Sequence, residues 1–211
     1  MPEPAMFLAF LAAVIVMQAT PGPDMMLVMS RGIGEGRRAA WWTVVGFMLA
    51  GLVQVPLLAS GVGALVAAHP LALDALRLAG GAYLVWLGLR LILDGDPNGE
   101  MRARPASAAR AMREGMINNL TKPKSLMFML AFLPQFVDPA RGSVTLQLAV
   151  LGITQKLSGL VIQGAVASGA GTLGAFLARR PSFVLWQARL AGAVMVGPGL
   201  RLLVGDGRTR S

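Results

Sequence analysis

Apolar residues occupy six long stretches of the chain, and short basic or polar connectors separate them. A helix that crosses the hydrocarbon core of a membrane needs about 20 mostly apolar residues. Each stretch reaches that length, so the pattern predicts an all-α integral membrane protein with six transmembrane helices. The predicted spans cover residues 5–30, 41–67, 71–93, 115–137, 144–176 and 186–205.

The composition agrees with a membrane environment. Of the 211 residues, 55% are hydrophobic and 14% are charged, and the mean hydropathy is +0.62, whereas soluble domains carry about 25% charged residues. This apolar content excludes a disordered chain. Because the sequence has no cysteine and one histidine, it offers no ligand set for structural zinc or an iron–sulfur cluster, and we expect neither a metal nor a cofactor.

The net charge of +9 is concentrated in the connectors on one side of the predicted membrane. The connectors after the first, third and fifth spans hold twelve basic residues, and the opposite side holds five. The positive-inside rule then predicts cytoplasmic basic loops and two external termini. The basic tail at Arg208 and Arg210 leaves open a five-span chain with a cytoplasmic C-terminus. Few aromatics and scattered basic residues disfavour a nucleic-acid partner.

Short motifs recur at an offset of about 100 to 112 residues. The RLAG and GLRL motifs at 77–80 and 88–91 return at 189–192 and 199–202, and a weaker match links 23–27 to 123–127. Three spans per repeat force the two halves into opposite orientations, an arrangement typical of many secondary transporters. We therefore predict one membrane domain over 1–211. Repeat one covers about 5–93, a basic connector about 94–114, and repeat two about 115–205.

The first span contains the break Pro21-Gly22-Pro23-Asp24. Two prolines and a glycine interrupt a helix, and broken backbone at membrane depth is tolerated where it is buried in protein or lines a wet cavity. An intramembrane carboxylate indicates function. Asp24 is a candidate for binding a substrate ammonium group or a coupling proton. The alternative is that the span ends near Thr20 and that Pro23 and Asp24 form an interfacial turn and helix cap.

Polar residues in three other spans complete the candidate site. Asn119, Pro123 and Lys124 open the fourth span, where Lys124 is a candidate for binding a substrate carboxylate or pairing with Asp24. The alternative is an interfacial lysine that snorkels toward water. Lys156 in the fifth span is either a buried partner or another snorkelling lysine. Gln54 in the second span either lines the same cavity or bonds a neighbouring helix.

Enzyme motifs are absent from the sequence: it has no GxSxG, P-loop or HExxH pattern and no paired acid/base carboxylates. We expect a protein that is not an enzyme. Without a nucleotide-binding domain in the chain, transport would draw on an ion gradient or an external partner. Glycine- and alanine-rich helix faces leave dimerisation open.

Four motifs in order resemble the LysE/RhtB family of amino-acid exporters, which includes lysine, homoserine/threonine and leucine efflux proteins. They are Ala19–Asp24 in the first span, the basic connector Arg31–Ala40, Leu78–Gly88 in the third span, and Gly115–Pro139 with Asn119, Pro123, Lys124 and FLPQFVDP. The resemblance covers nearly the whole chain.

The resemblance implies a small exporter of the bacterial inner membrane, driven by the proton-motive force. Pro23 and Asp24 correspond to the family's first-span motif, and Asn119, Pro123 and Lys124 to its fourth-span motif. The chain departs from the family at Lys156, where an acidic residue is often found, and at Pro198. A lysine in the site disfavours a dibasic substrate, so we expect a neutral amino acid or a close derivative. The alternatives are export of a basic amino acid or toxic amine, and a non-transporting scaffold or accessory subunit in which Asp24 and Lys124 form a structural ion pair.

Overall fold

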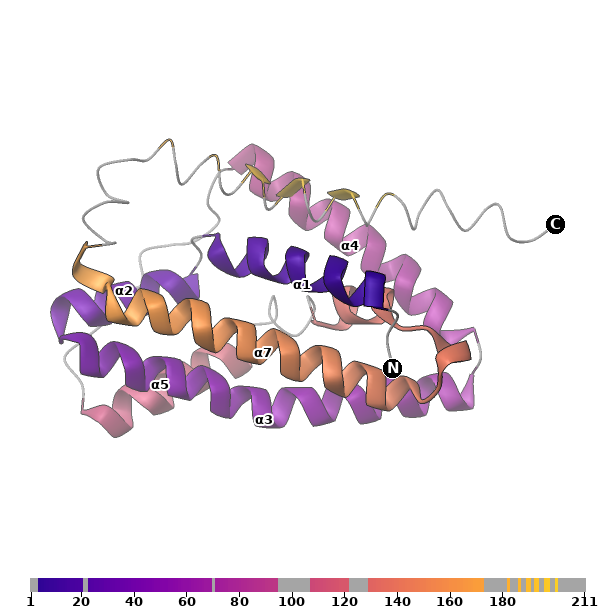
Figure 1. The fold of residues 1–211 in the computed structure, drawn as a ribbon, viewed down its shortest axis with the longest axis horizontal. Coiled ribbons are helices and arrows are strands. Elements are labelled where there is room, and N and C mark those ends of the chain that lie inside the picture. The colour runs from indigo at the N-terminus through magenta and orange to yellow at the C-terminus, as the bar shows by residue number, and fades with distance from the viewer. Residues whose placement is uncertain are drawn as a thin grey trace.

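The computed structural model describes residues 4–20, 23–69, 71–94, 107–121 and 129–172, with isolated positions between 182 and 200. Over these ranges the regular elements are all helical (Figure 1), which confirms the predicted all-α class. The helices are α1 (Pro4–Ala19), α2 (Pro23–Gly34), α3 (Arg37–Ala68), α4 (Ala72–Asp94), α5 (Ala108–Thr121) and α7 (Val144–Ser168), and the 3-10 turns are η1 (Leu133–Phe136) and η2 (Pro139–Arg141).

The long helices α3 and α7 lie side by side and antiparallel in the centre of the molecule (Figure 1). Glycines permit this close approach, because a Cβ at Gly51 would touch Lys156 and one at Gly63 would overlap Thr145. Residue numbers therefore rise along α3 as they fall along α7. Small residues at a helix interface bring backbones together in membrane proteins, where packing rather than the hydrophobic effect holds helices in contact.

The shorter helix α5 crosses the first half of α3 at similarly close range. A Cβ at Gly46 would overlap the Met112 carbonyl, and one at Gly115 would lie 2.5 Å from the Thr43 carbonyl oxygen. Fourteen residues of helix extend only about 21 Å, which is less than the hydrocarbon core of roughly 30 Å. The described part of α5 reaches Thr121, and its last turn lies beside the middle of α3, where Gln54 donates to the Asn119 carbonyl.

An aromatic cluster joins α1 to η1. The ring of Phe10 lies 5.8 Å from Phe132 and 5.3 Å from Phe136, and the last two rings are 4.9 Å apart. Arg77 of α4 fixes the same turn, since it donates to the carbonyls of Pro134 (3.1 Å) and Val137. These contacts close one end of the bundle around a core of large apolar side chains.

The outer faces of α3 and α7 expose apolar side chains. Leu52 and Leu57 on α3 and Val161 on α7 are 72%, 66% and 71% exposed. Both helices are long and apolar enough to cross a membrane, and α1 with α2, bent by 46°, forms a third candidate span. A lipid environment accounts for these faces, because large apolar patches are rare on soluble monomers. The count of six spans and the inverted repeat stay predictions.

Residues 122–128 of the predicted fourth span, 115–137, lie outside the described residues, so this span stays a prediction. Residues 115–121 belong to α5, which begins at Ala108, and Leu133–Phe136 form the 3-10 turn η1. Pro134 lies in the first turn of η1, where a proline ring fixes φ and removes a backbone donor. The turn η1 thus lies in a stretch that average hydropathy treats as uniform.

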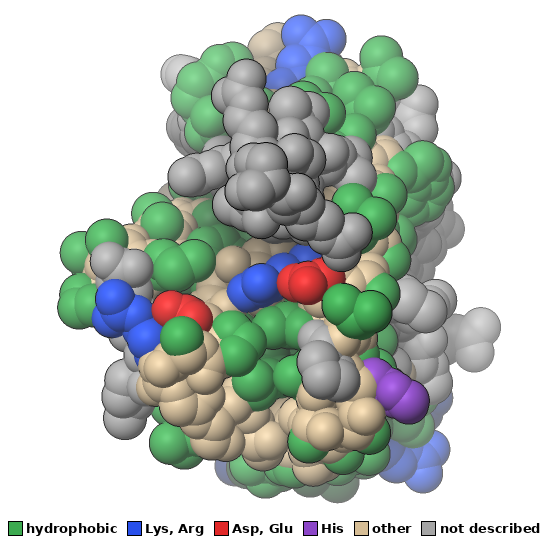
Figure 2. All heavy atoms as spheres, turned by 90° about the vertical axis from the view of Figure 1, so that its right-hand side faces the viewer, with side chains coloured by type: hydrophobic (Ala, Val, Ile, Leu, Met, Phe, Trp, Pro, Cys, Tyr) green, Lys and Arg blue, Asp and Glu red, His purple; other side chains and the backbone are tan. Residues whose placement is uncertain are grey.

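The two ends of the bundle differ in charge. Figure 2 views the end at which α3 finishes and α7 begins, where acidic and basic side chains gather in small mixed groups. The ion pairs here are Asp74–Arg77 (3.7 Å) and Asp138–Arg141 (3.3 Å). The opposite end has an excess of positive charge among its described residues: Arg31, Arg37, Arg38, Arg110 and Arg113 against Glu35 and Glu114. Such asymmetry is what the positive-inside rule uses; the cytoplasmic assignment stays a prediction.

Candidate functional site

Lys156 lies at the midpoint of α7, far from either helix end. Its ammonium donates hydrogen bonds to Gln54 Oε1 of α3 (2.7 Å) and Asn119 Oδ1 of α5 (3.2 Å). Both acceptors are neutral amide oxygens on buried residues. The cation is therefore held inside the bundle by dipoles that orient it and leave its formal charge in place.

Gln54 also bonds the backbone of Asn119, which fixes the Gln54 side chain. Gln54 Nε2 donates to the backbone carbonyl of Asn119 at 2.9 Å, and Gln54 is 1% exposed while Asn119 is 6% exposed. A buried amide is costly unless its donor and acceptor are both used. Here the Gln54 amide uses its nitrogen on Asn119 and its oxygen on Lys156, so the three side chains form one connected unit.

Asp24 joins this unit through the neighbouring residue Asn118. The amide nitrogen of Asn118 donates to Asp24 Oδ1 at 3.2 Å, and the carboxylate of Asp24 interacts electrostatically with the Lys156 ammonium. Asp24 occupies the first turn of α2, where the helix dipole favours a negative charge. We call Asp24, Gln54, Asn118, Asn119 and Lys156 the polar cluster; α2, α3, α5 and α7 each contribute to it.

Gly51 makes room for the Lys156 side chain. A Cβ at this position would lie 2.9 to 3.1 Å from the Cδ, Cγ and Cε atoms of Lys156. The aliphatic part of the lysine therefore runs across α3 at a point with no side chain and reaches Gln54, one helical turn further along. A glycine that appears in the sequence as one more small packing residue thus sets the path of the only lysine among the described residues.

A second group of amides lies beside Lys156 on α7. Gln18 of α1 donates to the backbone carbonyl of Gln155 at 2.9 Å, and a Cβ at Gly159 would lie 2.6 Å from Gln18 Oε1. Among the described residues, the side-chain oxygens of Gln155 and Gln163 are buried without a hydrogen-bond partner. Helix α7 therefore carries buried acceptors at Gln155 and Gln163 beyond the groups that hold Lys156.

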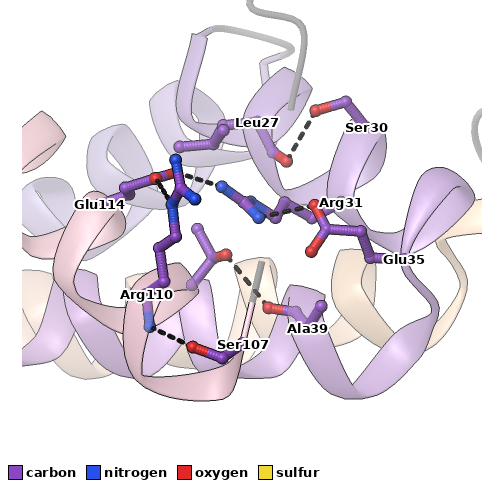
Figure 3. A network of polar contacts seen from close by, with 9 residues as sticks. Leu27, Ser30, Arg31, Glu35, Ala39, Ser107, Arg110 and Glu114 are labelled. Atoms are coloured by element: carbon purple, nitrogen blue, oxygen red, sulfur yellow. Dashed lines mark hydrogen bonds and ion pairs between the residues drawn. The ribbon is translucent and has the colours of Figure 1, made fainter. Parts of the chain in front are cut away.

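A network of four charges lies at the positive end of the bundle, where the side chains of Arg31, Glu35, Arg110 and Glu114 point toward one another (Figure 3). Arg31, 1% exposed, donates to Glu35 one turn on in α2 (2.6 Å) and to Glu114 of α5. Arg110 Nε also donates to Glu114, at 2.8 Å. We call Arg31, Glu35, Arg110 and Glu114 the arginine network. Its formal charges cancel, and one of its ion pairs joins α2 to α5.

The structure brings together four of the residues singled out from the sequence. Asn119, Lys156 and Gln54 are in direct contact, and Asp24 reaches them through Asn118. Pro23 is the first residue of α2. Pro21, Gly22, Pro123 and Lys124 lie outside the described residues, so their roles stay predictions.

Sequence reasoning omitted Asn118 from the site and placed Arg31 among ordinary basic connector residues. Asn118 precedes Asn119, and adjacent helical residues point about 100° apart, so one amide can face α2 while the other faces α7. The available signal for Arg31 was Glu35 four residues later, a spacing that pairs charges on one helix face. Glu114, 83 positions away, carried no such local signal.

Apolar outer faces around an interior cluster of charged and amide groups define a helical membrane protein with a polar interior site. The chain belongs to the LysE type translocator family, whose model matches residues 15–206. This family consists of transporters. The resemblance drawn from the four motifs is therefore confirmed.

The chain is similar over most of its length to bacterial membrane proteins. It is 32% identical to a membrane protein of Vibrio cholerae, covering 93% of this chain and 95% of that one. It is 29% identical to a homoserine/homoserine lactone efflux protein of Salmonella typhimurium (80% and 82%). It is 24% identical to a leucine efflux protein of Klebsiella pneumoniae (93% and 93%). No solved structure matches the chain.

Proposed function

We propose that this protein exports a neutral amino acid, or a close derivative, across the bacterial inner membrane in exchange for protons. The observation that carries the proposal is the polar cluster, in which a lysine and an aspartate lie in the interior of the bundle and neutral amides connect them. The efflux proteins to which the chain is similar support the direction and the substrate class.

The polar cluster is complementary to an amino-acid zwitterion. Lys156 supplies a cation for the substrate carboxylate, and Asp24 supplies an anion for the substrate ammonium group. Because Lys156 bonds only neutral oxygens in the described part of the chain, a carboxylate can replace one of them without breaking an ion pair. The same positive charge repels the second cation of a basic amino acid, which favours a neutral side chain.

Asp24 is the group proposed to carry the coupling proton. It lies where α1 and α2 meet at a 46° bend, and it accepts a hydrogen bond from Asn118. In the proposed cycle its carboxylate alternates between a proton and the substrate ammonium group. The proline-containing breaks at Pro21–Pro23 and at Pro123 act as hinges, and Lys124 provides a second anchor for the carboxylate.

Transport by the purified protein in lipid vesicles tests the proposal. Vesicles loaded with labelled leucine, homoserine or lysine are given an imposed pH gradient, and release of label is followed. We expect the wild-type protein to release leucine or homoserine but not lysine. Asp24→Asn removes the titratable carboxylate with little change in size, so release should fall to that of loaded vesicles that contain no protein.

Asp74→Asn is the matched control. It makes the same chemical change on α4, where Asp74 contacts Arg77 near the surface, and should leave release unchanged at equal membrane abundance. Normal release by Asp24→Asn contradicts the mechanism. Release of lysine alone contradicts the neutral substrate, and wild-type vesicles that move none of the three contradict amino-acid export.

A further inference from the structure

The arginine network lies on the same face of α2 and α5 as the contact between Asp24 and Asn118. Arg31 follows Asp24 by seven residues, which is two helical turns and about 10 Å along the axis. Glu114 precedes Asn118 by four residues, or one turn. Residues at these spacings share a helix face. The seam between α2 and α5 is therefore joined twice, once within the polar cluster and once by Arg31 and Glu114.

The second junction is the stronger one. Arg31 is 1% exposed, and its contacts are charge-assisted hydrogen bonds to two carboxylates. The Asp24–Asn118 contact is a single hydrogen bond of 3.2 Å in which the carboxylate is charged and the amide is neutral, whereas both members of the Arg31–Glu114 pair are charged. A separation of α2 from α5 that opens the polar cluster toward the positive end of the bundle must break the ion pair as well as this hydrogen bond.

Both helices are short. Helix α2 has twelve residues and joins α1 at a bend of 46°, and the described part of α5 has fourteen residues. Short half-helices that meet near a central site are typical of transporters with alternating access. An ion pair between two such helices is therefore placed to control access to the site.

We propose that the Arg31–Glu114 ion pair closes the seam between α2 and α5 on the side of the positively charged end, and that it opens when the site becomes accessible from that side. The inference rests on the proposed transport function, because it assigns the ion pair to one half of the transport cycle. Glu35 shares Arg31 with Glu114 but belongs to α2 itself. It can keep Arg31 paired when the seam opens.

The sequence contains no cysteine, so one introduced thiol reports on the seam without background. Leu27 is 5% exposed and lies on α2 between Asp24 and Arg31, three residues after the first and four before the second. Leu27 belongs to an apolar cluster with side chains of α3 and α7, so the rate at which a polar maleimide labels Leu27→Cys in detergent measures how often α2 separates from the helices that cover it. This measurement needs no substrate.

Adding Glu114→Gln to Leu27→Cys should raise the labelling rate about tenfold or more, because losing a hydrogen bond to a charged group shifts an equilibrium by roughly that factor. Glu35→Gln is the matched control, since it also neutralises a partner of Arg31 but one that lies on α2, the same helix as Arg31. It should raise the rate far less. Glu114→Asp, which keeps the charge but shortens its reach, should fall between wild type and Glu114→Gln.

Equal labelling of wild type and Glu114→Gln overturns the proposal, as does an equal increase in Glu35→Gln, which would mean that any loss of charge near Arg31 loosens α2. If Glu114→Gln does not accumulate in the membrane, Glu114→Asp decides the question on the same criterion. Release of labelled leucine is measured on the same preparations. If Glu114→Gln labels faster but the wild-type protein does not release leucine, the ion pair is supported as a latch and the proposed function is contradicted. If the wild-type protein releases leucine but Glu114→Gln labels at the wild-type rate, the proposed function is supported and the latch is contradicted.

Discussion

In the described part of the bundle, Arg31 and Lys156 both lie between helices, and the surroundings of these two cations differ. Arg31 contacts the carboxylates of Glu35 and Glu114, so its charge is cancelled within the protein. Lys156 donates to the amide oxygens of Gln54 and Asn119, which are polar but uncharged. A buried ion is stable when it is paired, so Arg31 meets the ordinary requirement of a structural charge. Lys156 meets it less completely and keeps a charge that an anionic ligand can use.

This difference separates stability from function. Removing Arg31 leaves Glu35 and Glu114 with one cation fewer, a defect of the folded state. Removing Lys156 leaves two amide oxygens without this donor and Asp24 without the attraction of this cation, but it also removes a half-buried charge that was costly to desolvate. We therefore expect substitution of Arg31 to lower mainly the stability of the protein and substitution of Lys156 to lower mainly its export activity.

Arg31→Met should give the largest loss of stability. Breaking a buried ion pair by removing one partner costs about 3–5 kcal/mol, and Glu35, whose side chain is 8% exposed, would lose its ion-pair partner. Thermal unfolding in detergent and the amount of protein in the membrane measure the loss. The double variant Arg31→Met with Glu35→Gln should recover part of it, because the carboxylate left behind is then neutral. A stable single variant would show that the arginine network contributes little to folding.

Lys156→Met should abolish export and lower stability far less than Arg31→Met. Methionine has a similar length and no charge, so it can follow the same path past Gly51 while Gln54 and Asn119 each lose a donor, at about 1–3 kcal/mol for a buried group. The lost desolvation cost of the ammonium offsets part of this. Vesicle release and thermal unfolding are measured on one preparation. Normal export, or instability equal to that of Arg31→Met, would remove the distinction between the two cations.

The sequence could predict the helical class and part of the polar cluster because both depend on local features. Stretches of apolar residues are visible by length, and an isolated Lys156 or Asp24 in such a stretch is conspicuous. The sequence could not predict that Glu114 pairs with Arg31 or that Asn118 bonds Asp24, since these contacts depend on how α5 crosses the bundle.

The turn near the end of the predicted fourth span is invisible to the hydropathy pattern for a related reason. Average hydropathy over 115–137 is insensitive to local backbone geometry, whereas Leu133–Phe136 form the 3-10 turn η1 with Pro134 in its first turn. Pro123, the proposed hinge of this stretch, lies outside the described residues, so its role stays a prediction.

The smallest predicted effect concerns the space that Lys156 occupies. Gly51→Ala places a methyl group 2.9 Å from Lys156 Cδ, so the flexible side chain must shift by a few tenths of an ångström while the helix gains about 1 kcal/mol of intrinsic propensity. Gly61→Ala on the same helix is the matched control, because a Cβ there meets no atom within 4 Å. Both variants should be about as stable as wild type or slightly more stable.

Only Gly51→Ala should weaken substrate affinity, seen as a several-fold higher KM for export, because it displaces the Lys156 ammonium from Gln54 and Asn119. Equal KM values in the two variants would mean that the position of the Lys156 ammonium does not set affinity, and that the carboxylate of the substrate is bound elsewhere.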